Sequence, residues 1–215
     1  MNKQKTEIKN LYKIKKSDKN KMYNTLMSAF EEYPKLINTF SEKSVRITAL
    51  EATIRYYGEY DFHYGCGYSL DDSVSEVALL VHSDEMNYTL PRHIISGSYG
   101  KDYRHAIRRL SRINRKKRIA LFEELDALEK DIKIPYPHIY LDFLGTEKAL
   151  QGQGRGRKLM SCICAHSDIV QLPIMLFTNT DADICFYKSL GFKTIGIAKS
   201  ERFGFINTYL LYEPK

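Results

Sequence analysis

The hydrophobic pattern of the first part of the chain predicts one short strand and two helices. Residues 8–15 (IKNLYKIK) are predicted to form a first strand. Ser17 or Asp18 is a suitable cap for a helix that runs through about Phe30, with apolar residues near helical spacing. Pro34 interrupts this pattern, and a second helix is predicted from about 44 to 57.

Two strands and a helical stretch are predicted next. Strands at 61–69 and 74–82 are separated by the turn signal Asp71-Asp72-Ser73, and the second contains VALLV, which is apolar enough for a central strand. Residues 84–134 are predicted to be mainly helical, and 121–132 (LFEELDALEKDI) carry the clearest helical pattern.

The last third alternates between strands and helices. A strand at 138–145 leads into a helix that ends at about Asp168, and a buried strand follows at 173–178. A short helix at 179–190 stops at Gly191, and a final antiparallel pair is predicted at 192–199 and 203–213. This order predicts an α/β layered fold in a single domain over 1–215.

Composition narrows the class of protein. The 215 residues are 43% hydrophobic and 27% charged, which excludes wholesale disorder, and four cysteines are too few for a disulfide scaffold. The pair Cys162-x-Cys164 lacks zinc-knuckle spacing, so no metal site is expected. No signal peptide or membrane span is recognised, and we expect a cytoplasmic protein without membrane association.

The net charge of +7 makes an anionic partner plausible, and much of it lies in residues 108–118 (RRLSRINRKKR). Three interpretations remain open for this run: a solvated helical face, a substrate-facing or anion-binding patch, and a nucleic-acid contact. The run contains no aromatic residues on which bases would stack, which disfavours nucleic acid.

The chemistry-bearing motif is Gln151-Gly152-Gln153-Gly154-Arg155-Gly156, between a predicted strand and a predicted helix. Alternate glycines let a backbone approach a ligand closely, and their N–H groups with the helix N-terminus form a cradle for a pyrophosphate. Arg155, Arg157 and Lys158 add positive charge to it. The Gly-Lys-Ser/Thr of a P-loop is missing, and the third glycine comes too early for a dinucleotide fingerprint, which disfavours NAD.

Two segments resemble the GNAT superfamily of N-acetyltransferases. YLDFLGTEKALQGQGRGRKLM at 140–160 resembles its strand 4, acetyl-CoA loop and helix 3, and LFTNTDADICFYKSLGF at 176–192 resembles its strand 5 and helix 4. The joint match covers about 138–192. It implies a mixed, mostly antiparallel central sheet flanked by helices, with 84–134 as a helical insertion before strand 4. Thr146 and Lys148 depart from the Val and Pro common in the family.

The resemblance also implies a function. AFEEYP at 29–34 and the length resemble the branch that includes puromycin N-acetyltransferase. An acetyl-CoA-dependent N-acetyltransferase is therefore expected, with acetyl-CoA as cosubstrate, direct transfer to a small-molecule primary amine, and a monomer or homodimer. A peptide or protein amine as acceptor and a non-catalytic CoA-binding module are the alternatives.

Site residues follow from the resemblance position by position. The backbone of the strand end would contact pantetheine and thioester, the glycine loop would bind the pyrophosphate, and Asn179 and Tyr187 would lie along the arm. The cofactor-binding set is Leu144, Gly145, Thr146, Gln151, Gly152, Gln153, Gly154, Arg155, Gly156, Asn179 and Tyr187. Asn179 is also a plausible helix cap beside Thr180.

Catalysis would rest on an acid and a base. Tyr187 is expected to protonate the departing CoA thiolate, and the N–H of Leu144 to stabilise the oxyanion. Tyr140 stands where some relatives carry a glutamate base, so Asp142 is the first candidate base and His138 the second. Strand alternation predicts Tyr140 and Asp142 on one face with Leu144. Five tyrosines would wall the amine site or fill the core: Tyr56, Tyr57, Tyr60, Tyr64 and Tyr68.

Overall fold

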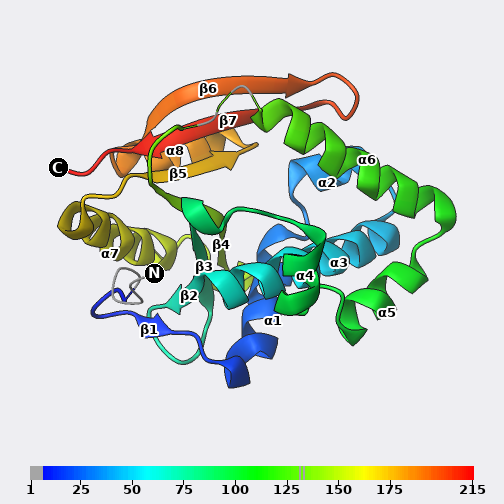
Figure 1. The fold of residues 1–215 in the computed structure, drawn as a ribbon, viewed down its shortest axis with the longest axis horizontal. Helices are drawn as coiled ribbons and strands as arrows, with labels where there is room; N and C mark the ends of the chain where they lie inside the picture. The colour runs from blue at the N-terminus through cyan, green and yellow to red at the C-terminus, as the bar shows by residue number, and fades with distance from the viewer. Residues whose placement is uncertain (1–6, 131, 133) are drawn as a thin grey trace.

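The structure, a computed structural model, describes residues 7–130, 132 and 134–215, and within them a seven-stranded sheet runs through the centre of the molecule (Figure 1). The strand order is β1-β2-β3-β4-β5-β7-β6, and each neighbouring pair is antiparallel except β4 and β5. The strands are β1 (Tyr12–Lys13), β2 (Cys66–Ser69), β3 (Glu76–His82), β4 (Ile139–Thr146), β5 (Ile174–Thr178), β6 (Lys193–Ser200) and β7 (Phe205–Tyr212). The predicted mixed, mostly antiparallel fold is confirmed.

Helices cover both faces of this sheet. On one face α7 (Arg155–Val170) and α8 (Asp181–Ser189) pack on the apolar side chains of β3, β4, β5 and β7. On the other face α1 (Lys19–Phe30) and α3 (Lys43–Tyr64) bury Met22, Leu26 and Ile54 against Val77 and Leu79 of β3. α1 and α7 each present an apolar stripe to one side of the sheet.

Two predicted boundaries at the N-terminal end are wrong. The first strand is confined to Tyr12–Lys13, and residues 61–64 continue α3 instead of opening a strand. Their side chains alternate as in a strand, but Asp61 continues the buried helical face that includes Ile54 and Gly58. The helix stops at Gly65, where a Cβ would stand 2.1 Å from the Leu80 carbonyl oxygen, so only glycine lets the chain pass β3 this closely.

The segment between β3 and β4 holds three of the remaining helices, α4 (Leu90–Ser96), α5 (Lys101–Arg109) and α6 (Arg112–Glu129), while α2 (Pro34–Thr39) follows α1 and begins at Pro34. Short 3-10 turns η2 (Lys16–Asp18), η3 (Ser83–Glu85) and η4 (Lys148–Leu150) complete the order. The basic run is divided between the end of α5 and the start of α6. Figure 1 shows α6 extending from α5 towards the β6–β7 hairpin, where Leu121 packs with Phe203 and Phe205.

Two irregularities of β4 open the sheet. β4 and β5 pair only at Ile139–Ile174 and Tyr140–Met175, so the two strands separate beyond those residues. A bulge opposite Leu79 and Leu80 leaves Asp142 without a partner in β3. The extra residue shifts the alternation: Leu144 lies with Leu141 on the α7 side, whereas Tyr140 packs in a cluster on the other side. The prediction of Tyr140 and Asp142 on one face with Leu144 is therefore wrong.

Candidate active site

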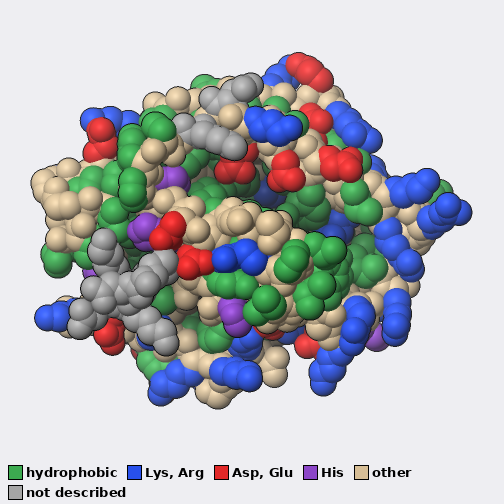
Figure 2. Space-filling model, in the orientation of Figure 1, with side chains coloured by type: hydrophobic (Ala, Val, Ile, Leu, Met, Phe, Trp, Pro, Cys, Tyr) green, Lys and Arg blue, Asp and Glu red, His purple; other side chains and the backbone are tan. Residues whose placement is uncertain are grey.

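A cavity of about 1220 Å³ occupies the wedge between β4 and β5. It reaches from the loop before α7, along β4, to side chains of α3, α4 and α6. Figure 2 shows the molecule hollowed below α6, with Asp and Glu side chains along the upper edge of the hollow. The cavity therefore brings the glycine motif and the helices between β3 and β4 into one site.

The glycine loop forms one end of the cavity. Gly152 and Gly154 have positive φ angles of 77° and 78°, which favour glycine, and a Cβ at either position would meet no protein atom within 4 Å. Gly154 is the N-cap of α7 and no side chain caps that helix. Open space in front of an uncapped helix N-terminus is suited to an anion, so the residues fit the pyrophosphate of acetyl-CoA.

The side chains of this loop serve the fold. Gln151 Nε2 donates to the Thr146 carbonyl at 3.0 Å, and Gln153 Nε2 donates to the Ala149 carbonyl. Gln153 does not line the cavity, whereas Gln151 does.

Arg155 is bound to protein carboxylates. Its guanidinium contacts the fully buried Glu76 and lies 2.9 Å from Asp71, which ties α7 to the β2–β3 hairpin. Arg155 lines the cavity beside the glycine loop, as its place in the sequence predicts, but two carboxylates balance its positive charge. Arg157 lines the cavity with an exposed side chain.

The end of β4 runs along the cavity. Leu144, Gly145 and Thr146 all line it. A Cβ on Gly145 would lie 2.8 Å from the Ala29 Cβ, so this glycine lets α1 pack closely on β4. Beyond Tyr140 the backbone has no partner in β5 and is available to an extended ligand.

Asn179 lies beside the cavity and is not part of its wall. Its side chain donates to the Ile206 carbonyl at 2.8 Å and to Asn207 Oδ1, while its Oδ1 is buried without a partner among the described residues. The cap of α8 is Thr180, whose hydroxyl accepts from the Asp183 N–H. The helix-cap alternative for Asn179 is therefore wrong.

Tyr187 lines the cavity from α8. Its ring packs edge-on against Phe186 and Phe192, and burial followed by the nearby Asp183 raises the pKa of its phenol well above the ordinary value. The phenol stays protonated and is able to donate. Tyr33 is a second phenol in the wall, hydrogen-bonded to Thr178 Oγ1 at 2.9 Å, with its pKa raised to about 12 by burial.

Asp142 faces the cavity with two partners that sequence reasoning missed. Asp61 of α3 is fully buried, and neither of its carboxyl oxygens nor Asp142 Oδ2 has another hydrogen-bond partner among the described residues. Burial and the nearby Asp142 charge raise the pKa of Asp61. Two neighbouring carboxyls in a buried site disfavour double ionisation, so the pair retains one proton and carries about one negative charge. Burial also raises the pKa of Asp142, opposed by its interaction with Asp61 and by the charge of Lys35.

Lys35 is the cation of this cluster. It lines the cavity with its Nζ 4.9 Å from the Phe177 ring centre, and burial lowers its pKa to about 8 against the opposing effect of Asp142. Asp61 had a sequence signal, a carboxylate at helical spacing from Ile54 and Gly58 on a buried face. Lys35 had none.

The other proposed base lies elsewhere. His138 is buried outside the cavity wall, with Nδ1 2.8 Å from the Tyr136 carbonyl oxygen, and burial lowers its pKa. Tyr140 does line the cavity, and burial raises its pKa well above the ordinary value.

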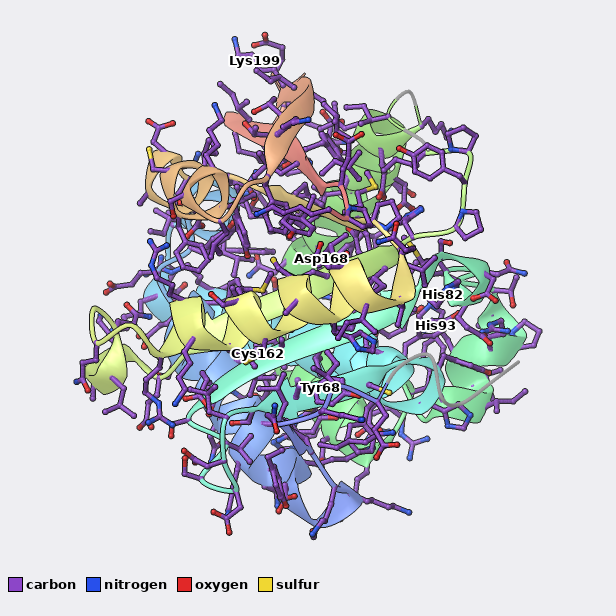
Figure 3. The ribbon with its side chains drawn as sticks, turned by 90° about the vertical axis from the view of Figure 1, so that its left-hand side faces the viewer. Tyr68, His82, His93, Cys162, Asp168 and Lys199 are labelled. Atoms are coloured by element: carbon purple, nitrogen blue, oxygen red, sulfur yellow. The ribbon has the colours of Figure 1, made fainter. Side chains whose placement is uncertain are left out.

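Aromatic rings wall the end of the cavity farthest from the glycine loop. Tyr56 and Tyr57 line it, whereas Tyr60 and Tyr64 do not, and Tyr68 is buried in β2 beneath α7 (Figure 3). The further rings are Tyr88, His93, Tyr99, Tyr103 and Phe122. The tyrosine-rich segment is thus divided between cavity wall and core.

The basic run contributes one residue to this end. Its other basic side chains, Arg108, Arg109, Arg112, Arg115, Lys116 and Lys117, are exposed. Figure 2 shows Lys and Arg gathered over α5 and the start of α6. Arg118 is buried and lines the cavity.

Among the described residues no cluster of His, Cys, Asp and Glu is arranged to hold a metal ion. The helices of the described part of the chain include none with the length and hydropathy to cross a bilayer.

Comparisons with known proteins agree with the fold. Residues 118–194 match the family model of the acetyltransferase (GNAT) domain. None of the curated proteins matches the sequence. Among solved structures, one of a histone acetyltransferase HPA2 and related acetyltransferase from Corynebacterium glutamicum aligns with a TM-score of 0.60 at 19% identity, over 96% of each chain.

Two further structures share the fold. Arylalkylamine N-acetyltransferase 2 from Aedes aegypti aligns with a TM-score of 0.53 at 11% identity, over 95% of this chain and 98% of that one. The C-terminal condensation domain of Ebony, in complex with beta-alanyl-dopamine, aligns with a TM-score of 0.63 at 8% identity, over 94% and 97%. The chain therefore has the GNAT acetyltransferase fold.

Proposed function

We propose that this chain, which has the GNAT acetyltransferase fold, is an acetyl-CoA-dependent N-acetyltransferase. It transfers the acetyl group directly to the primary amine of a small molecule. One observation carries the proposal: a single cavity joins the glycine loop of α7 to the buried carboxylates at the β4 bulge. The first end fits the pyrophosphate of acetyl-CoA, and the second holds a proton acceptor where the amine would lie.

Each group has a role in this reaction. Bound acetyl-CoA supplies the acetyl thioester. Asp142 accepts the proton of the amine, and the proton shared with Asp61 keeps a second negative charge out of the buried site. Tyr187 holds a proton for the CoA sulfur, since its raised pKa keeps the phenol neutral at physiological pH.

Lys35 assists the base. Its positive charge lowers the pKa of Asp142, so more of the carboxylate is available to take a proton near neutral pH.

Three observations weigh on the alternatives. An acceptor space walled by aromatic rings from several helices favours a small amine over a protein segment. A carboxyl that faces the cavity with a raised pKa, Asp142, favours catalysis over a non-catalytic CoA-binding module. The fold is shared with a condensation domain, so the fold alone leaves the acyl donor open, and the loop at α7 is what favours CoA. Membership of the puromycin branch stays a prediction.

A thermal melt with acetyl-CoA, with NADH as control, tests the donor. At 100 times Kd, acetyl-CoA would stabilise the folded state by about 2.7 kcal/mol, or roughly 5–11 °C for this size. Gly154→Glu should abolish the rise. Gly204→Glu is the matched control, because Gly204 also has a positive φ of 65° but lies in the β6–β7 turn. A rise that survives Gly154→Glu, or no rise at millimolar acetyl-CoA in the wild type, would refute the assigned donor site.

A further inference from the structure

Arg118 is a buried cation in the wall of the acceptor space. Its side chain is on α6 and is only 6% exposed. The guanidinium carbon lies 4.6 Å from the ring centre of Phe122, 5.6 Å from that of Tyr103 and 5.9 Å from that of Tyr56. Three aromatic rings therefore surround a planar cation that lines the cavity.

No acidic side chain pairs with this guanidinium within residues 7–130, 132 and 134–215. Its Nε is buried without a hydrogen-bond partner, and Nη2 donates only a long bond of 3.4 Å to the Ala52 carbonyl. After burial, the groups that most affect its pKa are the hydroxyls of Tyr103, Tyr57 and Tyr56. A buried guanidinium without a counter-charge is unfavourable for folding, and the cation–π contacts offset only part of that cost.

The unpaired cation and the carboxyl pair belong to the same cavity. Tyr57 lies near both, since its pKa is raised by the charges of Asp142 and Asp61 and lowered by that of Arg118. The cavity thus holds the Asp142 carboxyl beside β4, where the amine would react, and the Arg118 guanidinium on α6. A molecule that spans it would meet opposite charges at its two ends.

Other charges also face this cavity. Glu123, Asp126 and Glu129 line it from α6, and desolvation raises the pKa of the exposed Asp126. They lie more than one helical turn beyond Arg118, so they do not form an ion pair with it. These carboxylates would attract an amine, and Arg118 is the group in this wall that would favour an anion.

We propose that the acceptor carries an anionic group, a carboxylate or a phosphate, which pairs with Arg118 while its amine faces Asp142. The inference rests on the proposed function, because it assigns the acceptor of that same site. A planar guanidinium with free N–H groups binds carboxylate or phosphate through two parallel hydrogen bonds. The aromatic rings of the cavity wall suit an acceptor with an apolar or aromatic side chain. Amino acids with such side chains are therefore the first acceptors to test.

The test uses acceptors that differ only in the anionic group. Release of CoA is followed with tyrosine and tyramine, with lysine and cadaverine, and with phosphoethanolamine and ethanolamine. The anionic member of at least one pair should have the higher kcat/KM in the wild type, and the pair concerned distinguishes carboxylate from phosphate. In Arg118→Met, kcat/KM for that member should fall by about 30-fold or more, while the value for its neutral partner should change little.

Two variants control for folding and charge. Arg112→Met removes one positive charge from an exposed position of the same helix and should behave as the wild type. Arg118→Lys keeps the charge without the planar fork and should give an intermediate preference. Because replacing a buried unpaired charge with an apolar side chain is often neutral or stabilising, Arg118→Met should melt no lower than the wild type.

Failure of the inference and failure of the proposed function give different results. Transfer to amines with no preference for any anionic member, or with a preference that persists in Arg118→Met, overturns the inference and leaves the acetyltransferase in place. An acetyl-CoA melting shift with no transfer to any amine overturns the proposed function, and the inference falls with it. Binding of 3-(4-hydroxyphenyl)propanoate, measured by calorimetry without acetyl-CoA, should be lost in Arg118→Met and kept in Arg112→Met.

Discussion

Replacing Arg155 with Met would separate its structural role from a role in phosphate binding. The side chain is 28% exposed and contacts Glu76, which has no exposed surface. Loss of one partner of a buried ion pair costs about 3–5 kcal/mol. Glu76 would keep donors from Ser69 Oγ and the Leu70 N–H, both at 2.8 Å, and Arg155 is partly hydrated. We therefore expect a loss of about 2–3 kcal/mol, or a melting temperature about 5–10 °C lower.

The assay is urea unfolding of a double-mutant cycle. Glu76→Gln removes the charge that Arg155→Met would leave unpaired, so the double variant should be more stable than the sum of the single effects by about 1–2 kcal/mol. Acetyl-CoA affinity in the double variant should stay within about threefold of the wild type, since two carboxylates already hold the guanidinium. Additive stabilities, or a tenfold loss of affinity in the double variant, would refute this account.

Three further predictions concern the cavity. Gly145→Ala should lower the free energy of unfolding, measured by chemical denaturation, by about 1–3 kcal/mol. The reason is that the added Cβ would lie 2.8 Å from the Cβ of Ala29. Lys35→Met should move the acid limb of the kcat/KM profile to higher pH, because the cation that lowers the pKa of Asp142 is gone. Asp61→Asn should be more stable than the wild type at pH 7, since the raised pKa of Asp61 makes wild-type stability fall as pH rises above about 4.

Controls and contrary outcomes differ between the three. Ala29→Gly added to Gly145→Ala should recover part of the lost stability, and no recovery would contradict the steric explanation. Lys148→Met, at an exposed lysine paired with Glu32, should leave the acid limb in place. For Asp61→Asn, melting curves between pH 4 and pH 8 should show a smaller slope than in the wild type; an equal slope would mean that Asp61 holds no proton.

Much of the fold was predictable because hydrophobic periodicity and turn residues act locally. The order of elements from β4 to β7 follows from such signals, including Gly191 after α8. The strand predicted at 61–69 failed at its start because Asp61 and its neighbours read as a strand by alternation, while tertiary packing continues them as a helix. The bulge at Asp142 has no local signature, since it arises from pairing with β3.

The candidate site was predictable from the sequence only where it is formed by the backbone. Gly152 and Gly154 carry a recognisable motif because their φ angles restrict the residue type. Lys35 and Arg118 reach the cavity from α2 and α6, and Asp61 of α3 lies behind Asp142. Only the fold brings these residues together. The spacing of the basic residues in 108–118 along a helix does not by itself show that Arg118 is the one that points into the cavity.

The limited pairing of β4 with β5 has a consequence for cooperativity. The sheet consists of two antiparallel units, β1–β4 and β5–β7, that share two residue pairs along one edge. A ligand that lies between the separated strands contacts both units and acts as a removable connection between them. Amide exchange should then slow on both sides of the wedge when the ligand binds, including β7, which does not line the cavity. In such a molecule each round of ligand binding and release during turnover would raise and then lower the local stability of the sheet.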